Sequence, residues 1–396
     1  MWLQFGTESA VAQDLWQPVR DALDGNGLIQ GATLQVWRFN ANTEDALLFE
    51  HTKGNITIET EQEIWSASKW VAAVAIMRQV ELTTSLGLDD LLSRHLSYWP
   101  TDPADSRSRI TLRHLLGFAS GYTDVTQTWG YVLPVACLTG GIQACARGVL
   151  DSHEHTHEPG TMIDYNSIHL TLAGAMVEAA TGVPIGQIVQ ANVLSRAGMA
   201  STRYTDHPFP FLAGGLVSTP ADYQRFLSAY LGNRLLSSPQ ALDEMMSDAH
   251  PAAGKDGLFA LLAARYGLGN WFECPTLISP DPSQWPPECE EAQIHTSPGA
   301  SGAYPLVDRR LGYYWYFGMD QGVGLGAAIA AVFRDTIKPL VDSAAAPNAS
   351  VVRRTGAVAG ERLQCLQQLM ADRSTAAPAG HVNASGLGHL DRKSVV

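Results

Sequence analysis

Residues 63–77 read EIWSASKWVAAVAIM. Apolar residues at helical spacing follow Ser66, so this run predicts a helix that opens near Ser66 and continues to Leu82. In such a helix, Lys69 lies one turn above Ser66 on the same face. The N-terminus of the helix supplies backbone N–H groups for an oxyanion, and a desolvated lysine can take a serine proton. Taken alone, however, the motif is better explained by Ser66 as an N-cap and Lys69 as a surface residue.

Further segments with a recognisable pattern follow this pair along the chain. They are Leu88-Asp89-Asp90, Ile110 to Leu116 with Ser120-Gly121, Glu158-Pro159-Gly160 with Tyr165, Gly174 and Glu178, and residues 213–227, AGGLVSTPADYQRFL. In this order they resemble the serine β-lactamase-related superfamily of class C β-lactamases, D-Ala carboxypeptidases and serine esterases, over about residues 15–340. The resemblance implies that Ser66 is the nucleophile and that Lys69 and Tyr165 share the proton transfers.

The second motif of this superfamily, Tyr-x-Asn, is altered here. Counting back from Gly174 places Tyr165 at the tyrosine, but the asparagine position holds Ser167, with Asn166 between them. Ser167 can still hydrogen-bond the lysine or a substrate, yet it lacks the reach and the paired donor and acceptor of an amide. We therefore expect poor recognition of β-lactams and a closer relation to amidases and esterases.

The third motif, Lys-Thr-Gly or His-x-Gly in the superfamily, is also altered. The corresponding stretch is residues 294–302, IHTSPGASG. An ungapped count from Gly302 places Ser297 where a backbone N–H completes the oxyanion hole. It places His295 within the Lys-Thr-Gly stretch, in a register uncertain by one or two residues. We expect His295, Ser297 and Gly299 to line the site together with Ser167.

Strand-like runs lie at both ends of the chain and helices lie between them. Strands are expected at 33–39, 46–51, 266–273, 294–308 and 311–320, and helices at 16–28, 66–82, 88–96, 110–116, 167–182, 219–231, 237–246 and 325–343. Together with the resemblance, this order predicts an α/β fold of the β-lactamase/transpeptidase type: an antiparallel sheet flanked by helices, with a mainly helical inserted lobe. The catalytic domain should cover 1–345, with a sheet lobe from about 1–90 and 260–345 and a helical lobe at about 90–260. Residues 346–396 are expected to form a disordered tail.

Composition excludes several classes of protein. Hydrophobic residues make up 45% of the 396 residues, which is ample for a packed core and excludes a largely disordered chain. The net charge of −13 argues against a nucleic-acid partner, because phosphate binding needs a basic surface. No apolar run is long enough to span a bilayer. We expect a small ester, amide or peptide as substrate, and the composition does not indicate the oligomeric state.

The cysteines and the glycosylation sequons do not determine the cellular compartment of the protein. Cys137 and Cys145 are close in sequence, as are Cys274 and Cys289, with Cys365 left over. Two disulfides are conceivable, but free cysteines are the simpler expectation. The N-terminus has no basic start and no long apolar run, so it does not resemble a signal peptide. Sequons at Asn55, Asn348 and Asn383 nevertheless leave secretion open.

One stretch imitates a zinc motif. His153-Glu154-His155-Thr156-His157 has the form H-E-x-x-H, which binds zinc when both histidines share one helical face. Pro159-Gly160 closes the segment and no helical apolar periodicity surrounds it, so we expect a solvated loop. No metal or other cofactor is therefore expected.

Two hypotheses for function remain. The first is a serine hydrolase, an esterase or amidase more than an efficient β-lactamase, which forms an acyl-enzyme on Ser66. The second is a catalytically weak relative that serves as a binding or structural protein. Retention of Ser66, Lys69 and Tyr165 together favours the enzyme, whereas the altered second and third motifs keep the alternative open.

Overall fold

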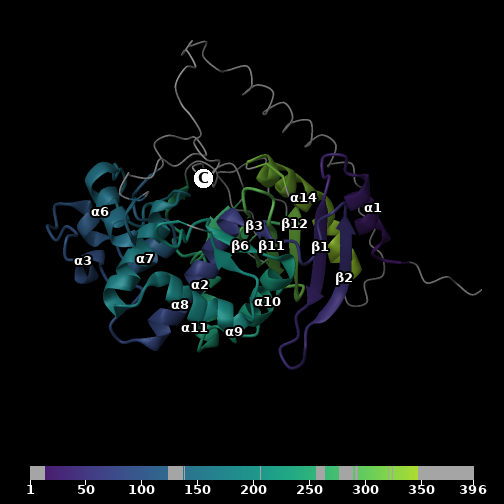
Figure 1. Cartoon of the computed structure of the whole chain (residues 1–396), viewed down its shortest axis with the longest axis horizontal. Coiled ribbons are helices and arrows are strands. Elements are labelled where there is room, and N and C mark those ends of the chain that lie inside the picture. Colours follow the sequence, from purple (N-terminus) through teal and green to yellow (C-terminus); the bar gives the residue numbers. More distant parts are fainter. Residues whose placement is uncertain are drawn as a thin grey trace, which may run out of the picture.

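The computed structural model describes residues 14–123, 137, 139–205, 207–255, 264–275, 289, 293–319, 321–322 and 324–346. Apart from Ala346, the tail that we expected to be disordered, residues 346–396, lies outside the described residues, as does Cys365. A mixed α/β architecture with one large sheet is apparent (Figure 1).

The large sheet has seven strands, and every neighbouring pair is antiparallel. From edge to edge the strands are β2 (Ala46–Lys53), β1 (Ala32–Arg38), β12 (Tyr313–Met319), β11 (Tyr304–Asp308), β10 (Ile294–Thr296), β9 (Trp271–Glu273) and β8 (Ala264–Tyr266). Because β1 pairs with β12, a strand from the N-terminal part of the chain lies beside one from the C-terminal part within the sheet. The predicted antiparallel sheet, closed from both termini, is confirmed.

Each face of the sheet packs against a different set of helices. Along β12, Tyr313, Trp315 and Phe317 pack in a cluster with α1 (Gln17–Gly25) and α14 (Leu325–Ala345). The alternate residues Tyr314 and Tyr316 pack in the larger cluster with the remaining helices. This period of two is that of a strand buried on both faces. In Figure 1, α1 and α14 lie to the right, and α3, α6 and α7 lie to the left.

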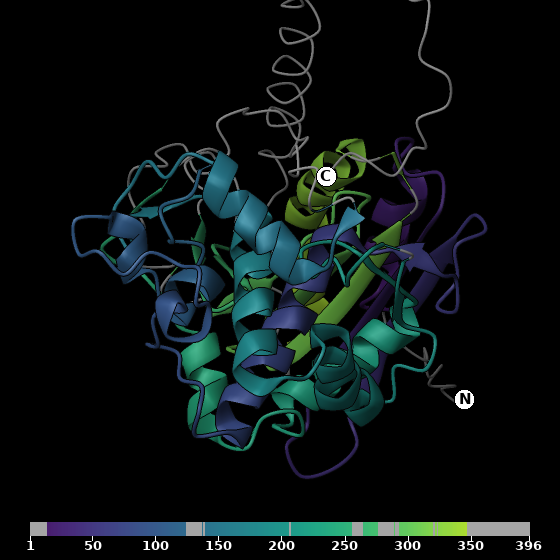
Figure 2. The same cartoon turned by 60° about the vertical axis from the view of Figure 1, so that its left-hand side comes forward.

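The larger cluster is built around α2 (Ser68–Leu82) and α7 (Ile168–Thr181), which lie side by side (Figure 2). Residues 68–77 of α2 are all buried, so it is a core helix with no solvent face in that part. The other helices here are α3 (Leu92–His95), α4 (Leu112–Leu116), α6 (Ile142–Ser152), α8 (Ile185–Val189), α9 (Ser195–Ala197), α10 (Pro220–Leu231) and α11 (Pro239–Met245), with short helical turns at Trp65–Ala67, Ser106–Arg109 and Gln190–Leu194. Short strands complete this part: β3 (Gln62–Glu63), β4 (Met162–Ile163), β5 (Arg203–Tyr204), β6 (Leu216–Ser218) and β7 (Gly254–Lys255).

The predicted end of α7 and the predicted start of α10 both have the expected capping residues. Gly182 follows α7 in the left-handed conformation with φ 69°, which glycine adopts without steric cost. The Thr219 side chain accepts a hydrogen bond from the Asp222 N–H and caps α10 ahead of Pro220. The division into two lobes near residues 90 and 260 stays a prediction.

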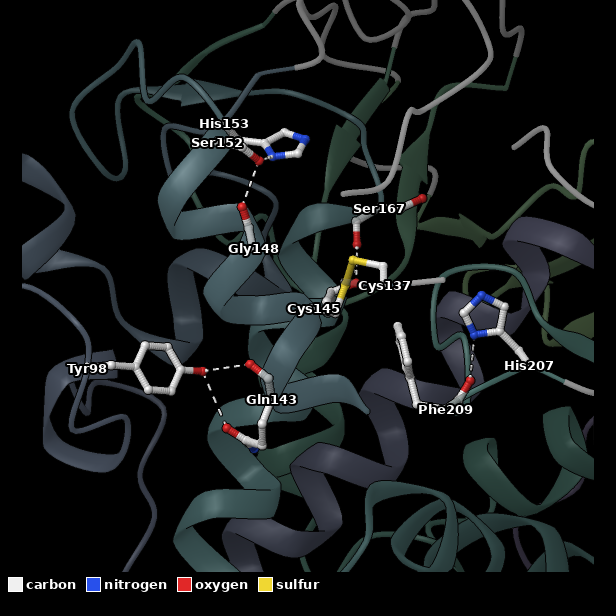
Figure 3. The surroundings of a disulfide bond; sticks show 11 residues. Tyr98, Cys137, Gln143, Cys145, Gly148, Ser152, His153, Ser167, His207 and Phe209 are labelled. Carbon is white, nitrogen blue, oxygen red and sulfur yellow. Dashed lines mark hydrogen bonds between the residues drawn. A yellow bond between two sulfur atoms is a disulfide. The ribbon is translucent and has the colours of Figure 1, made fainter. Parts of the chain in front are cut away.

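Four cysteines form disulfides, so the expectation of free cysteines is wrong for them. Cys137 pairs with Cys145 of α6, and Cys274 pairs with Cys289, at sequence separations of 8 and 15 residues. Figure 3 shows the first pair close to Ser167, at the start of α7. Sequence spacing alone does not reveal whether two cysteines that are close in sequence lie within bonding distance, and in both cases they do.

Within the described residues, no single helix is long and apolar enough to cross a membrane. The bent pair Ile168–Thr181 and Ile185–Ala197 passes a test of length and composition only. The first of these helices, α7, is largely buried in the protein core.

Candidate active site

Ser66 and Lys69 form a buried pair. The Nζ atom of Lys69 lies 2.9 Å from the Oγ atom of Ser66, and only 7% of Ser66 and 2% of Lys69 are exposed. Lys69 also donates to the backbone carbonyl of Ala213 over 2.6 Å. The interpretation of Lys69 as a surface residue is therefore wrong, because core helix α2 carries its side chain into the interior.

Burial of Lys69 sets its protonation state. The ammonium form is poorly solvated in this site, and desolvation lowers the pKa of Lys69 to about 7. Because the Ala213 carbonyl can only accept, Lys69 must direct one N–H toward it. A neutral amine then has its lone pair available for the proton of Ser66. The pair can thus act as nucleophile and base near neutral pH.

Tyr165 lies against this pair. Its ring centroid is 4.8 Å from Lys69 Nζ and 4.9 Å from the centroid of Trp271 on β9. Burial raises the pKa of Tyr165 to about 12, while hydrogen bonding to Ser66 and Trp271 opposes that rise. The site therefore holds a phenol, not a phenolate, close to the Ser66 hydroxyl at neutral pH.

The turn that carries Ser66 is strained. Ser66 lies in a 3-10 turn, Trp65–Ala67, immediately before α2, and not in the first turn of the α-helix itself as predicted. Trp65 has φ 47°, which is unusual and costly for a bulky residue. The surrounding protein holds the turn through hydrogen bonds that reach it from distant segments. These are Tyr223 Oη to Ala67 O, Ser301 Oγ to Glu63 O, Ser297 Oγ to Ser66 O, and Leu216 N to Ser68 Oγ.

The end of β10 meets this turn. The hydroxyl of Ser297 lies 2.9 Å from the carbonyl oxygen of Ser66. A Cβ atom at Gly299 would lie 2.2 Å from the carbonyl oxygen of Ile64, so no side chain fits there. The structure thus brings Ser297 and Gly299 to the turn that carries Ser66. The Ser297 contact is made by the side chain, which the motif count did not anticipate.

His295 lies within β10, two residues before Ser297. Its Nδ1 atom is 2.9 Å from Oδ1 of Asn270, and its ring stacks on Phe272 at 4.9 Å. Only 1% of His295 is exposed, and burial lowers its pKa to about 3. These contacts are with β9 and the turn before it, not with Ser66 or Lys69. A role of His295 in lining the site stays a prediction.

Asn166 and Ser167, which follow Tyr165, make different contacts. The Asn166 amide donates to the carbonyl of Tyr122 and to Asp164, and its oxygen accepts from the Ile168 N–H. Asn166 therefore shapes the turn into α7. Ser167 is the N-cap residue of α7 and is buried, with 5% exposed.

The zinc-like segment is not helical. Helix α6 ends at Ser152, and His153 has an extended backbone, as expected for a loop. Both ring nitrogens of His155 make hydrogen bonds, Nδ1 with Ser106 Oγ and Nε2 with the carbonyl of Ser120, at 2.9 and 2.8 Å. Among the described residues, no group of three or more His, Cys, Asp or Glu side chains could hold a metal ion.

With this geometry in place, comparison with known proteins identifies the family. Residues 51–336 match the beta-lactamase family. The chain belongs to this family. A search of curated proteins found no match.

Solved structures of the β-lactamase fold agree. A candidate β-lactamase from Bacteroides dorei DSM 17855 is 27% identical, with a TM-score of 0.61, and the match covers 82% of this chain and 98% of that one. EstCE1, a hydrolase with promiscuous acyltransferase activity, gives a TM-score of 0.64 at 18% identity, covering 83% and 99%. Unliganded simvastatin synthase from Aspergillus terreus gives 0.60 at 18% identity, covering 84% and 99%. The last two likenesses show the fold.

Two elements of this β-lactamase-family site were missed from the sequence. The Ala213 carbonyl holds Lys69, although its segment was recognised only as a pattern. Trp271 packs on Tyr165 from an edge region of the sheet. Backbone carbonyls have no residue-type signature, and the partner of a tryptophan depends on strand register, so neither contact could have been found without the fold.

Proposed function

We propose that this protein is a serine hydrolase that forms an acyl-enzyme on Ser66. The observation that carries the proposal is the buried Ser66–Lys69 pair, 2.9 Å apart, with the lysine pKa lowered to about 7. Burying a lysine costs stability, and that cost is understandable where the amine must be neutral to accept a proton.

In acylation, Ser66 Oγ attacks the carbonyl carbon of the substrate and its proton passes to the neutral Nζ of Lys69. Tyr165 donates its phenolic proton to the oxygen of the leaving alcohol as the ester bond breaks. The proton on Lys69 then restores the Tyr165 phenol, which lies against the amine. The products of this half-reaction are a free alcohol and an ester of Ser66.

In deacylation, water attacks the Ser66 ester and gives its proton to the same pair of groups. A proton then returns to Ser66 Oγ as the acid leaves, so the enzyme ends in its starting state. We assign the oxyanion contacts to the backbone N–H groups of Ser66 and of about Ser297. The proximity of β10 to the turn that carries Ser66 supports this assignment.

The substrate is an ester or amide in preference to a β-lactam. Ser167 stands where the family has an asparagine, so a β-lactam loses an amide contact. Proteins of similar fold include the hydrolase EstCE1 and a D-stereospecific amidohydrolase from Streptomyces. These activities support an acyl-transfer enzyme without fixing the substrate.

Labelling with a fluorophosphonate probe tests the proposal. The wild-type protein should be labelled, and Ser66→Ala should abolish labelling while the protein stays folded. Ser85→Ala, in an exposed turn, is the matched control and should label normally. Labelling that persists in Ser66→Ala and disappears with Ser68→Ala or Ser301→Ala would assign the nucleophile elsewhere. A wild-type protein that neither labels nor hydrolyses p-nitrophenyl esters would favour the binding-protein alternative.

A further inference from the structure

His169 lies in the first turn of α7, next to the segment that carries Tyr165, and is fully buried. Its Nδ1 atom is 2.9 Å from the hydroxyl oxygen of Ser120, and its Nε2 atom is 2.9 Å from the carbonyl oxygen of Asp164. Asp164 directly precedes Tyr165 in the chain. The imidazole therefore connects the turn after α4 to the peptide unit that leads into Tyr165.

These two partners determine the tautomer of His169. A carbonyl oxygen only accepts, so Nε2 must carry the hydrogen that points to Asp164. In a neutral imidazole Nδ1 then carries the lone pair, and the Ser120 hydroxyl donates to it. Burial lowers the pKa of His169 to about 3, so the ring stays neutral throughout the working range.

The same ring also supports Tyr165 through Phe118. The ring of His169 stacks on Phe118 with centroids 4.8 Å apart, and Phe118 contacts the Tyr165 ring at 5.4 Å. Phe118 has φ 59° and is fully buried, so its strained backbone is held by its surroundings. Its carbonyl accepts from the Asp164 N–H over 3.0 Å. Asp164 is thus held at its N–H by Phe118 and at its carbonyl by His169.

We infer that His169, oriented by Ser120, is a positioning residue that fixes the phenol of Tyr165 for proton transfer. It holds both the backbone before Tyr165 and the aromatic ring against which Tyr165 packs. His169 itself exchanges no proton with substrate. This inference rests on the proposed function, because it assumes that Tyr165 transfers protons during turnover.

Two substitutions separate the hydrogen bonds from the packing. His169→Phe keeps an aromatic ring against Phe118 but leaves the Asp164 carbonyl and the Ser120 hydroxyl without this partner. It should lower kcat by about 10- to 100-fold with little change in KM, since small misplacements of a reacting group have effects of this size. His169→Gln retains a donor for Asp164 and should recover most of the lost kcat.

Coupling to Tyr165 distinguishes positioning from general stability. In a Tyr165→Phe background, His169→Phe should cause no further loss of kcat, since the group that it positions is gone. Leu172→Ala, at a buried position of α7, is the control: it should lower the melting temperature and leave the kcat of the folded enzyme unchanged.

Three outcomes would overturn the inference. They are multiplicative effects of His169→Phe and Tyr165→Phe, an unchanged kcat in His169→Phe, and an equal loss of kcat in Leu172→Ala. Failure of the proposed function is recognised separately, because Ser66→Ala would then retain activity or labelling whatever happens at His169.

Discussion

The hydroxyl of Ser297 donates to the backbone carbonyl of Ser66 over 2.9 Å, so the end of β10 holds the peptide unit of the candidate nucleophile itself. Both residues are buried. Trp65, directly before Ser66, has a strained backbone. The turn should therefore relax to another conformation if the hydrogen bond from Ser297 is lost. Ser297 therefore contributes to the geometry of the site through its side chain as well as through its place on the strand.

Ser297→Ala should lower both stability and activity. Loss of one buried hydrogen bond and of the partner of a buried carbonyl costs about 1–3 kcal/mol, which a thermal melt would detect. On a p-nitrophenyl ester, kcat should fall more than KM rises, because the Ser66 backbone loses its tether. Ser297→Thr keeps the hydroxyl and should stay closer to wild type. Equal melting temperatures and kcat for Ser297→Ala and wild type would show that the contact has no such role.

Much of this architecture could be predicted from sequence because its elements have strong local patterns. The run after Ser66, the glycine after α7 and the Thr219-Pro220 start of α10 each define an element by nearby residues. The sheet was predictable as a class of structure, since its strands lie at both ends of the chain. Family resemblance then identified Ser66, Lys69 and Tyr165, which the structure brings together.

What could not be predicted depends on contacts between distant segments. The Ala213 carbonyl reaches Lys69 across 144 positions and Ser297 reaches Ser66 across 231, and no local pattern reports such pairings. His295 was expected to line the site from a motif count, yet its partners are Asn270 and Phe272. A one-residue change in register moves a strand side chain to the other face, so counting alone could not settle its surroundings.

Lys69 should impose the acid limb of the pH–rate profile. The reactive form is the neutral amine and its pKa is about 7, so kcat should rise with pH through about 7 and level off above it. Lys69→Arg keeps a cation that cannot lose its proton and should lower kcat by about 10²–10⁴-fold. Tyr165→Phe should also lower kcat, and the double variant should be little worse than either single one, since both serve one proton relay. Stopped-flow or steady-state assays of one ester from pH 5 to 9 give all of these values. An Arg variant with near-wild-type kcat would exclude Lys69 as the base.

The same burial makes Lys69 a pH-dependent cost to folding. In the unfolded chain its pKa is near the ordinary value of 10.5, so between pH 7 and 10.5 the unfolded state binds more protons than the folded state. The contribution of Lys69 to stability therefore rises with pH across that window and is least favourable below pH 7. Lys69→Met removes the amine, so it should raise the melting temperature at pH 6 and raise it less at pH 9. A shift of equal size at both pH values would contradict a lowered lysine pKa.

Trp271 should affect the pKa of Tyr165 as well as its position. Its hydrogen bonding opposes the burial-driven rise in the pKa of Tyr165, so its loss should move that pKa further from working pH. We expect Trp271→Phe to lower kcat by about tenfold, which is less than the loss of about 10²–10⁴-fold on removing an acid–base group, because the Tyr165 phenol remains. Trp315→Phe removes an equally buried indole from the opposite face of the sheet and should affect stability alone. Equal effects of the two substitutions on kcat would contradict a specific role for Trp271.

The preference for esters over β-lactams should depend on Ser167. Exchanging Asn166 and Ser167 together, as the motif alone suggests, would remove an amide that holds the Tyr122 carbonyl and the Ile168 N–H. Ser167→Asn alone leaves that amide in place and restores the family's residue at the start of α7. We expect it to raise nitrocefin turnover about tenfold relative to ester turnover, which is the effect of one well-placed hydrogen bond of about 1.4 kcal/mol. Ser167→Ala, which adds no amide, is the control and should leave the ratio near that of wild type. If wild-type protein hydrolyses nitrocefin as fast as its best p-nitrophenyl ester, or if Ser167→Asn leaves the ratio unchanged, residue 167 does not set the substrate preference.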